Sequence, residues 1–192
     1  MALFTSDELI SRTRDVVFTK SASAILDREA KTFSEDQSFD IFMSHSALDA
    51  KEILGLKLKI NDMGYSVYVD WIEDPQLDRS KVTKETAGHI QSRMQRCKSL
   101  FYAISANARG SIWMPWELGY FDGNDGKVAI LPIRQDNVQT RDYEGQEYLG
   151  LYPYINKDRH HGGTMPALWV FVDPKTYVSF DSFLKGENPY KH

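Results

Sequence analysis

Several features are scarce in this sequence, and each shortage excludes a class of protein. There is a single cysteine, Cys97, in 192 residues, so no internal disulfide can form and we expect a reducing compartment. No run of about 18 apolar residues is present, the length that crosses a membrane as a helix. The first residues also lack the cationic start and apolar core of a secretory signal. We therefore expect a cytoplasmic protein with no membrane partner.

Basic charge is also scarce. The 23 lysine and arginine residues are outnumbered by 27 aspartate and glutamate residues, which gives a net charge of −4. Because nucleic-acid-binding domains usually carry a basic patch or stripe, we expect no nucleic acid as a partner.

Motifs for cofactors and metals are missing too. The chain contains no glycine-rich dinucleotide or phosphate loop, no CxxC, no HExxH and no GxSxG, so the chemistry that these motifs carry loses support and we expect no cofactor. The adjacent His160 and His161 have no third ligand nearby in the sequence. We therefore predict no metal site.

What the chain does contain is an alternation of short apolar runs and helical patterns, which is typical of repeated strand and crossover-helix units. Five buried strands are predicted, over residues 39–43, 66–70, 99–105, 128–133 and 168–172, with a long irregular stretch before the last one. Helices are predicted over 46–63, 83–96, 112–123 and 179–184. This pattern predicts an α/β, flavodoxin-like three-layer fold with a five-stranded parallel sheet, in which ligands bind beyond the carboxyl ends of the strands.

The first 36 residues form a separate N-terminal helical extension in this interpretation, and residues 37–192 form the main domain. The segment Thr5–Glu8 fits a capping box, so a helix is predicted to follow it. Its apolar positions are sparse, and we expect it to pack onto the main domain or onto a partner. The segment Lys31–Gln37 is the expected joint.

One helix combines an aromatic plane with an acid. Trp113 and Glu117 are four residues apart and therefore share a face of the helix that follows the strand 99–105. In this architecture the first turn of that helix lies at the carboxyl edge of the sheet, where sites form. A structural interpretation is the more common one for such spacing, with Trp113 and Trp116 as core anchors and Glu117 as a solvated carboxylate.

Four segments in this order resemble the Toll/interleukin-1 receptor (TIR) domain family, particularly its bacterial members. The resemblance covers about residues 38–185 and rests on FDIFMSHSALDA, SVYVDWIEDPQLDR, the WxxxEL helix at Trp113–Leu118, and VAILPI. It implies that Glu117 is the catalytic carboxylate of the members that cleave NAD⁺. It also implies a substrate-binding set of Phe42, Ser44, His45, Trp71, Asp74, Trp113 and Trp116.

The implied reaction can use one carboxylate. The bond from ribose to nicotinamide breaks through an oxocarbenium-like transition state, whose positive charge a glutamate can stabilise. Nicotinamide leaves a pyridinium as a neutral molecule, so no second, proton-donating carboxylate is needed. Aromatic faces such as Trp113 and Phe42 suit the cationic pyridinium or the adenine ring.

The segment Trp71–Lys81 corresponds to the BB loop of that family, through which TIR domains associate head to tail. The resemblance therefore implies self-association through this loop. Many relatives have a glycine after the leucine of this loop, whereas here Asp78, Arg79 and Ser80 follow Leu77. This departure bears on the geometry of the assembly.

The resemblance extends to stand-alone TIR proteins of bacterial anti-phage systems such as Thoeris. It implies an NAD⁺ glycohydrolase or ADP-ribosyl cyclase, with NAD⁺ as substrate, that releases a linear or cyclic ADP-ribose signal to a separate effector. The alternative is a non-catalytic TIR–TIR adaptor, which has no need for Glu117. A third candidate, a nucleoside deoxyribosyltransferase-like enzyme, has a related sheet and a catalytic glutamate, but the loop favours the TIR family.

Overall fold

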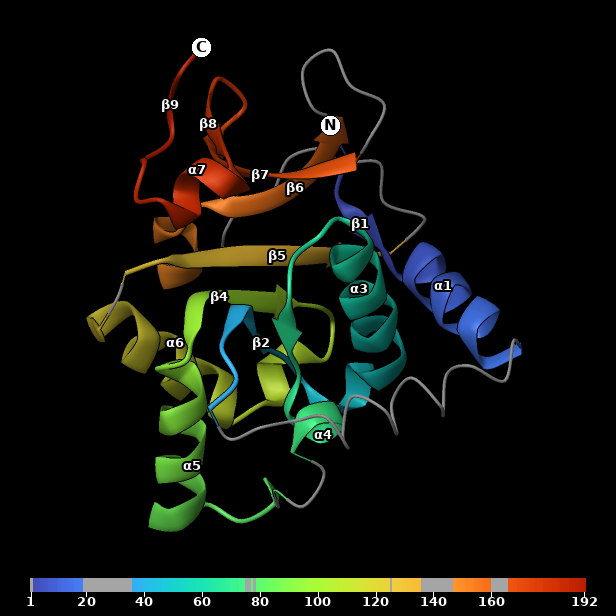
Figure 1. The fold of residues 1–192 in the computed structure, drawn as a ribbon, viewed down its shortest axis with the longest axis vertical. Coiled ribbons are helices and arrows are strands. Elements are labelled where there is room, and N and C mark those ends of the chain that lie inside the picture. Colours follow the sequence, from blue (N-terminus) through green and yellow to red (C-terminus); the bar gives the residue numbers. More distant parts are fainter. Residues whose placement is uncertain are drawn as a thin grey trace.

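One mixed sheet runs through the molecule, with helices on both of its faces (Figure 1). The structure is a computed structural model that describes residues 2–18, 36–74, 77, 79–124, 126–135, 147–159 and 166–192. The strands of these residues are β1 (Phe4–Thr5), β2 (Phe39–Ser44), β3 (Val67–Tyr68), β4 (Cys97–Ile104), β5 (Val128–Arg134), β6 (Tyr154–Arg159), β7 (Pro166–Asp173), β8 (Thr176–Ser179) and β9 (Tyr190–Lys191).

The helices fill two layers around this sheet. They are α1 (Ser6–Phe18), α3 (Ala50–Asp62), α4 (Asp70–Glu73), α5 (Lys84–Met94), α6 (Trp113–Asn124) and α7 (Phe180–Leu184), with short 3₁₀ turns at Ala47–Asp49, Ala108–Gly110 and Glu147–Leu151. One hydrophobic core lies between the sheet and α1, α3 and α7, and a second lies between the sheet and α5 and α6. The predicted three-layer α/β class is confirmed.

The order of the strands is β3-β2-β4-β5-β6-β7-β8-β9, and β1 also pairs with β5. All pairs from β3 to β6 are parallel, as is the pair of β1 with β5. Along residues 41–43 of β2, Ile41 and Met43 face one core and Phe42 faces the other, since successive side chains of a strand point to opposite faces. Because β2 and β4 are parallel neighbours, their carboxyl ends meet at one edge of the sheet.

The prediction of five parallel strands is wrong in number and in direction, since the described residues form a nine-stranded mixed sheet. The strand predicted over 168–172 exists within β7, but β7 pairs antiparallel with β6, and β6 lies in the stretch that was expected to be irregular. Only six residues separate β6 from β7, whereas a parallel crossover needs a dozen or more, so an antiparallel pair is the arrangement available. The sheet continues antiparallel through β8 and β9.

The N-terminal residues are part of the packed structure. Phe4 and Leu9 are fully buried in the same core as α3 and the strands, and the backbone N–H of Glu8 donates to Thr5 Oγ1 at 3.4 Å, one half of the predicted capping box. The other half does not form, because the Glu8 carboxylate pairs with Lys157. Most of the expected joint, residues 31–35, lies outside the described residues.

Two boundaries near the predicted loop also differ. The strand expected over 66–70 ends at Tyr68, and α4 begins at Asp70, so the segment Trp71–Lys81 starts inside a short helix. Of the helices in the described ranges, none is long and apolar enough to cross a bilayer.

Candidate active site

Glu117 lies on α6 and points into the protein. Its side chain is completely buried, which excludes the interpretation of a solvated helix carboxylate. Oε2 of Glu117 accepts a hydrogen bond from Ser44 Oγ at 2.6 Å, and Oε1 is paired with the guanidinium of Arg79. Ser44 ends β2, so the carboxyl end of that strand and the first half of α6 together fix the position of this carboxylate.

Burial has the largest effect on the pKa of Glu117. Removal from water raises the pKa of its carboxyl group, because the charged form loses hydration. The charge of Arg79 and the hydrogen bond from Ser44 oppose this effect, but the pKa of Glu117 remains above its ordinary value. Arg79 and Ser44 are therefore what favours the ionised form.

Arg79 connects Glu117 to a second carboxylate. Its Nη1 donates to Asp70 Oδ2 at 2.5 Å, while its other terminal nitrogen pairs with Glu117. The backbone of Arg79 is held as well, since Trp113 Nε1 donates to its carbonyl oxygen at 2.8 Å. The guanidinium carbon lies 5.8 Å from the centre of the Trp113 ring, within the range of a cation–π contact.

Asp70 is also in contact with His45. Nε2 of His45 lies 3.5 Å from Asp70 Oδ1, and the backbone N–H of Trp71 donates to the same oxygen at 2.8 Å. Burial raises the pKa of Asp70, but the charges of His45 and Arg79 and these hydrogen bonds outweigh it, and the pKa is lowered overall. Asp70 is therefore ionised at neutral pH.

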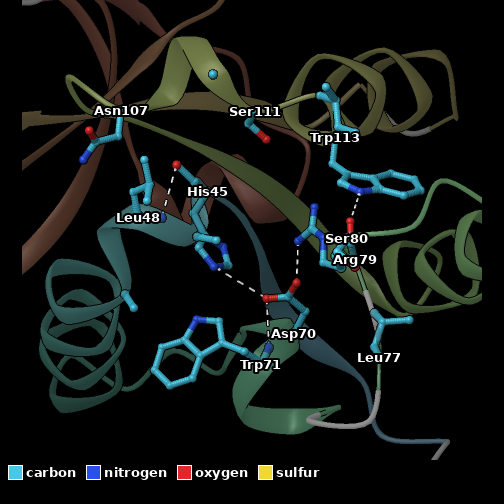
Figure 2. A pocket seen from close by; sticks show the side chains of 15 residues that line it. His45, Leu48, Asp70, Trp71, Leu77, Arg79, Ser80, Asn107, Ser111 and Trp113 are labelled. Atoms are coloured by element: carbon cyan, nitrogen blue, oxygen red, sulfur yellow. Dashed lines mark hydrogen bonds and ion pairs between the residues drawn. The ribbon is translucent and has the colours of Figure 1, made fainter.

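A cavity of about 560 Å³ opens beside this network. Figure 2 shows His45, Asp70 and Arg79 joined along its wall, with Trp71 and Trp113 nearby. Glu117 is not a lining residue, because Arg79 covers it. The full lining is His45, Ser46, Ala47, Leu48, Ala50, Asp70, Trp71, Leu77, Arg79, Ser80, Asn107, Gly110, Ser111, Ile112 and Trp113.

Part of the expected substrate-binding set meets at this cavity. His45, Trp71 and Trp113 line it, and Ser44 holds Glu117 behind it. Trp113 is also a core residue with 7% of its surface exposed, so the structural and functional interpretations both apply to its side chain.

Three other expected residues lie elsewhere. Phe42 is buried and stacks on Tyr68, with ring centres 5.3 Å apart, because the alternation along β2 turns it into the second core. The Asp74 carboxylate is fully buried in an ion pair with Arg93. Trp116 is partly buried and packs against the second core. Phe42, Asp74 and Trp116 are all absent from the lining of the cavity.

Asp70 and Arg79 were not among the expected site residues. Asp70 is the last residue of the predicted strand 66–70 and so stands at its carboxyl end, which was a usable signal. The sequence holds no comparable signal for Arg79, which depends on how its segment folds back onto α6.

No metal cluster was found in the part of the chain that the structure describes: no three histidine, cysteine, aspartate or glutamate side chains there are placed to hold an ion. His160 and His161 lie outside those residues.

Comparison with known proteins gives two relevant relatives. No family model matches the chain. It is 50% identical to the "Probable 3' cyclic ADP-D-ribose synthase ThsB'" of Bacillus cereus (strain MSX-D12) over 192 residues, which cover 96% of this chain and 99% of that protein. It is 28% identical to the "Putative cyclic ADP-D-ribose synthase TIR2" of Cytobacillus dafuensis over 93 residues, 48% of this chain and 24% of that protein.

Proposed function

Because the chain belongs to the ThsB'-like branch of the TIR-domain family, we propose that it cleaves the ribose–nicotinamide bond of NAD⁺ and forms cyclic ADP-ribose. The observation that carries this proposal is Glu117, a buried carboxylate held by Ser44 directly behind the wall of a cavity at the carboxyl edge of the sheet. A purely adaptor function would give no reason for a carboxylate held in this way.

The chemistry follows from the position of the charges. As the bond to nicotinamide breaks, positive charge develops on the ribose, and the ionised Glu117 stabilises it. The bonding electron pair leaves with nicotinamide, which becomes neutral. Ser44 keeps the carboxylate in place. The rings of Trp71 and Trp113, which line the cavity, suit the cationic and aromatic rings of the substrate.

Access to Glu117 requires a movement. Its carboxylate has no exposed surface and Arg79 lies between it and the cavity, so the ribose reaches it only after the guanidinium withdraws. Arg79 belongs to the segment Trp71–Lys81, and association of two chains through this segment is a means to move it. We therefore propose that the chain self-associates through this segment and that the association gives the ribose access to Glu117.

The cyclic product acts as a signal to a separate effector in anti-phage defence, and the reaction takes place in the cytoplasm with NAD⁺ as a substrate and with no resident cofactor. The ThsB' name of the relative that is 50% identical supports this setting.

The decisive experiment is a time course of purified protein with NAD⁺, followed by chromatography and mass spectrometry at several protein concentrations. We expect nicotinamide and cyclic ADP-ribose from the wild type, and a loss of at least about a hundredfold in Glu117→Gln. Glu85→Gln is the matched control, because Glu85 is exposed on α5 and outside the cavity. Equal turnover in Glu117→Gln, or no nicotinamide from the wild type at any concentration, would contradict the proposal.

A further inference from the structure

Ring closure requires a base that the cleavage step does not. The "3'" in the relative's name denotes ring closure through a ribose oxygen. In that step the C1–nitrogen bond breaks with its electron pair going to nicotinamide, and a hydroxyl oxygen of the adenosine ribose bonds to C1. The hydroxyl proton must then go to an acceptor, so one proton is released per turnover.

Among the described residues, Asp70 supplies the one carboxylate that lines the cavity. Asp70 and Glu117 bind the two terminal nitrogens of the same Arg79 guanidinium. The two carboxylates are therefore no further apart than one guanidinium and two hydrogen bonds. When Arg79 withdraws, both can face a single bound molecule, with Glu117 at the ribose and Asp70 at the attacking hydroxyl.

His45 provides an exit for the proton. A carbonyl oxygen only accepts hydrogen bonds, so the contact of 2.8 Å between His45 Nδ1 and the Met43 carbonyl places a proton on Nδ1. In the neutral ring Nε2 is then free to accept a proton, and it is Nε2 that faces Asp70, at 3.5 Å. Because Nδ1 is bound to the Met43 carbonyl, the ring is oriented with Nε2 toward Asp70, and the proton passes from Asp70 to Nε2.

We propose that Asp70 is the general base of ring closure and that His45 is the positioning residue that receives the proton from it. The proposal rests on the proposed function. A carboxylate is strong enough for this step, since a hydroxyl becomes strongly acidic as its oxygen bonds to a cationic carbon. When Arg79 withdraws, the backbone N–H of Trp71, which donates to Asp70 Oδ1 at 2.8 Å, remains to stabilise the ionised form of the acceptor.

The test is the partition between products. Without the base, water competes for the ribosyl cation, so Asp70→Asn should lower the ratio of cyclic to linear ADP-ribose at least about tenfold while nicotinamide is still released. His45→Gln should lower the ratio less. Because both products come from the same active molecules, the ratio does not depend on the fraction of protein that is folded.

Controls separate this proposal from the one on which it rests. Asp122→Asn removes an exposed carboxylate on α6 whose partner is the Tyr152 hydroxyl, and it should leave the ratio at the wild-type value. Asp70→Ser is a second variant at the same position. Serine and asparagine can both accept the hydrogen bond from the Trp71 N–H, so each variant removes the charge and keeps this contact.

Each outcome is informative. The role of Asp70 is overturned if the ratio of cyclic to linear product is unchanged in both Asp70 variants. It is also overturned if these variants have the same Tm as the wild type and no longer release nicotinamide. A wild type that releases nicotinamide but forms only linear product overturns it too, and leaves NAD⁺ cleavage standing. Absence of nicotinamide from the wild type counts against the proposed function itself.

Discussion

The carboxylate of Glu117 is the residue whose ionisation should limit activity at low pH. The stabilising role proposed for it needs the charged form, and burial raises its pKa above the ordinary value of a glutamate. The value of kcat/KM for nicotinamide release should therefore fall as the pH drops through this raised pKa, since kcat/KM reports groups of the free enzyme. A pH profile of kcat/KM measures the position of this acid limb.

Arg79→Met sharpens this prediction. The charge of Arg79 opposes the effect of burial on Glu117, so its removal should move the acid limb to higher pH. An acid limb at or below the ordinary pKa of glutamate, or a limb that stays in place in Arg79→Met, would show that Glu117 is not the titrating group.

Asp74 is a residue of the core rather than of the cavity. Its carboxylate accepts hydrogen bonds from Arg93 and from the Tyr68 hydroxyl, at 2.7 Å each. Arg93→Ala leaves a buried charge without this partner, which should reduce the free energy of unfolding by about 3 to 5 kcal/mol. Urea denaturation measures the loss.

A surface pair provides the control for Arg93. Arg12 and Asp62 also form an ion pair, at 3.0 Å, but their side chains are 30% and 58% exposed, against 5% and 0% for Arg93 and Asp74. Arg12→Ala should cost less than about 1 kcal/mol. Equal losses in the two variants would count against the importance of burial for the Asp74 pair.

At the level of elements, the contact between α1 and α3 depends on a glycine, Gly55, which has no side chain. A Cβ atom at Gly55 would lie 2.0 Å from the carbonyl oxygen of Leu9, which is backbone and cannot rotate away. Gly55→Ala should therefore separate the helices and lower the free energy of unfolding by about 1 to 3 kcal/mol. Gly88→Ala on α5, where nothing lies within 4 Å of the added atom, should raise it by up to about 1 kcal/mol.

Elements with a strong local pattern could be predicted from the sequence. The apolar run of β4 and the spacing of α3 and α6 each indicate one type of structure, and these predictions are confirmed. The sequence of β6, YINKDR, is mostly polar, and its pairing with β7 depends on the length of their connection. The direction of β7 therefore could not be derived from its own residues.

The same distinction holds for the site. Glu117 and Trp113 share one helix, and their spacing was visible in the sequence. Arg79 meets Glu117 across 38 residues, through a segment without a regular pattern, and its role becomes visible only in the folded chain. Phe42 lies in the second core, and the sequence does not show which of the two cores a buried strand position faces.

At the scale of the whole molecule, exposed apolar side chains lie at the cavity and next to the segment Trp71–Lys81. Leu48 and Ile112 line it and are 78% and 65% exposed, and Val82, 68% exposed, follows the segment Trp71–Lys81. Exposed apolar groups of this kind favour association. A second chain bound there would contact the segment that contains Arg79.

We expect nicotinamide release per molecule to increase with protein concentration, because we propose that association moves Arg79 away from Glu117. Val82→Glu places a charge in the contact and should weaken the concentration dependence, with at least about a tenfold loss of activity at low concentration. Val172→Glu is the matched control, as Val172 is 58% exposed at the antiparallel end of the sheet. Activity per molecule and molecular mass, measured over the same dilution series, test the link. A constant activity across the series, or equal losses in the two variants, would mean that Arg79 leaves Glu117 without the help of a second chain.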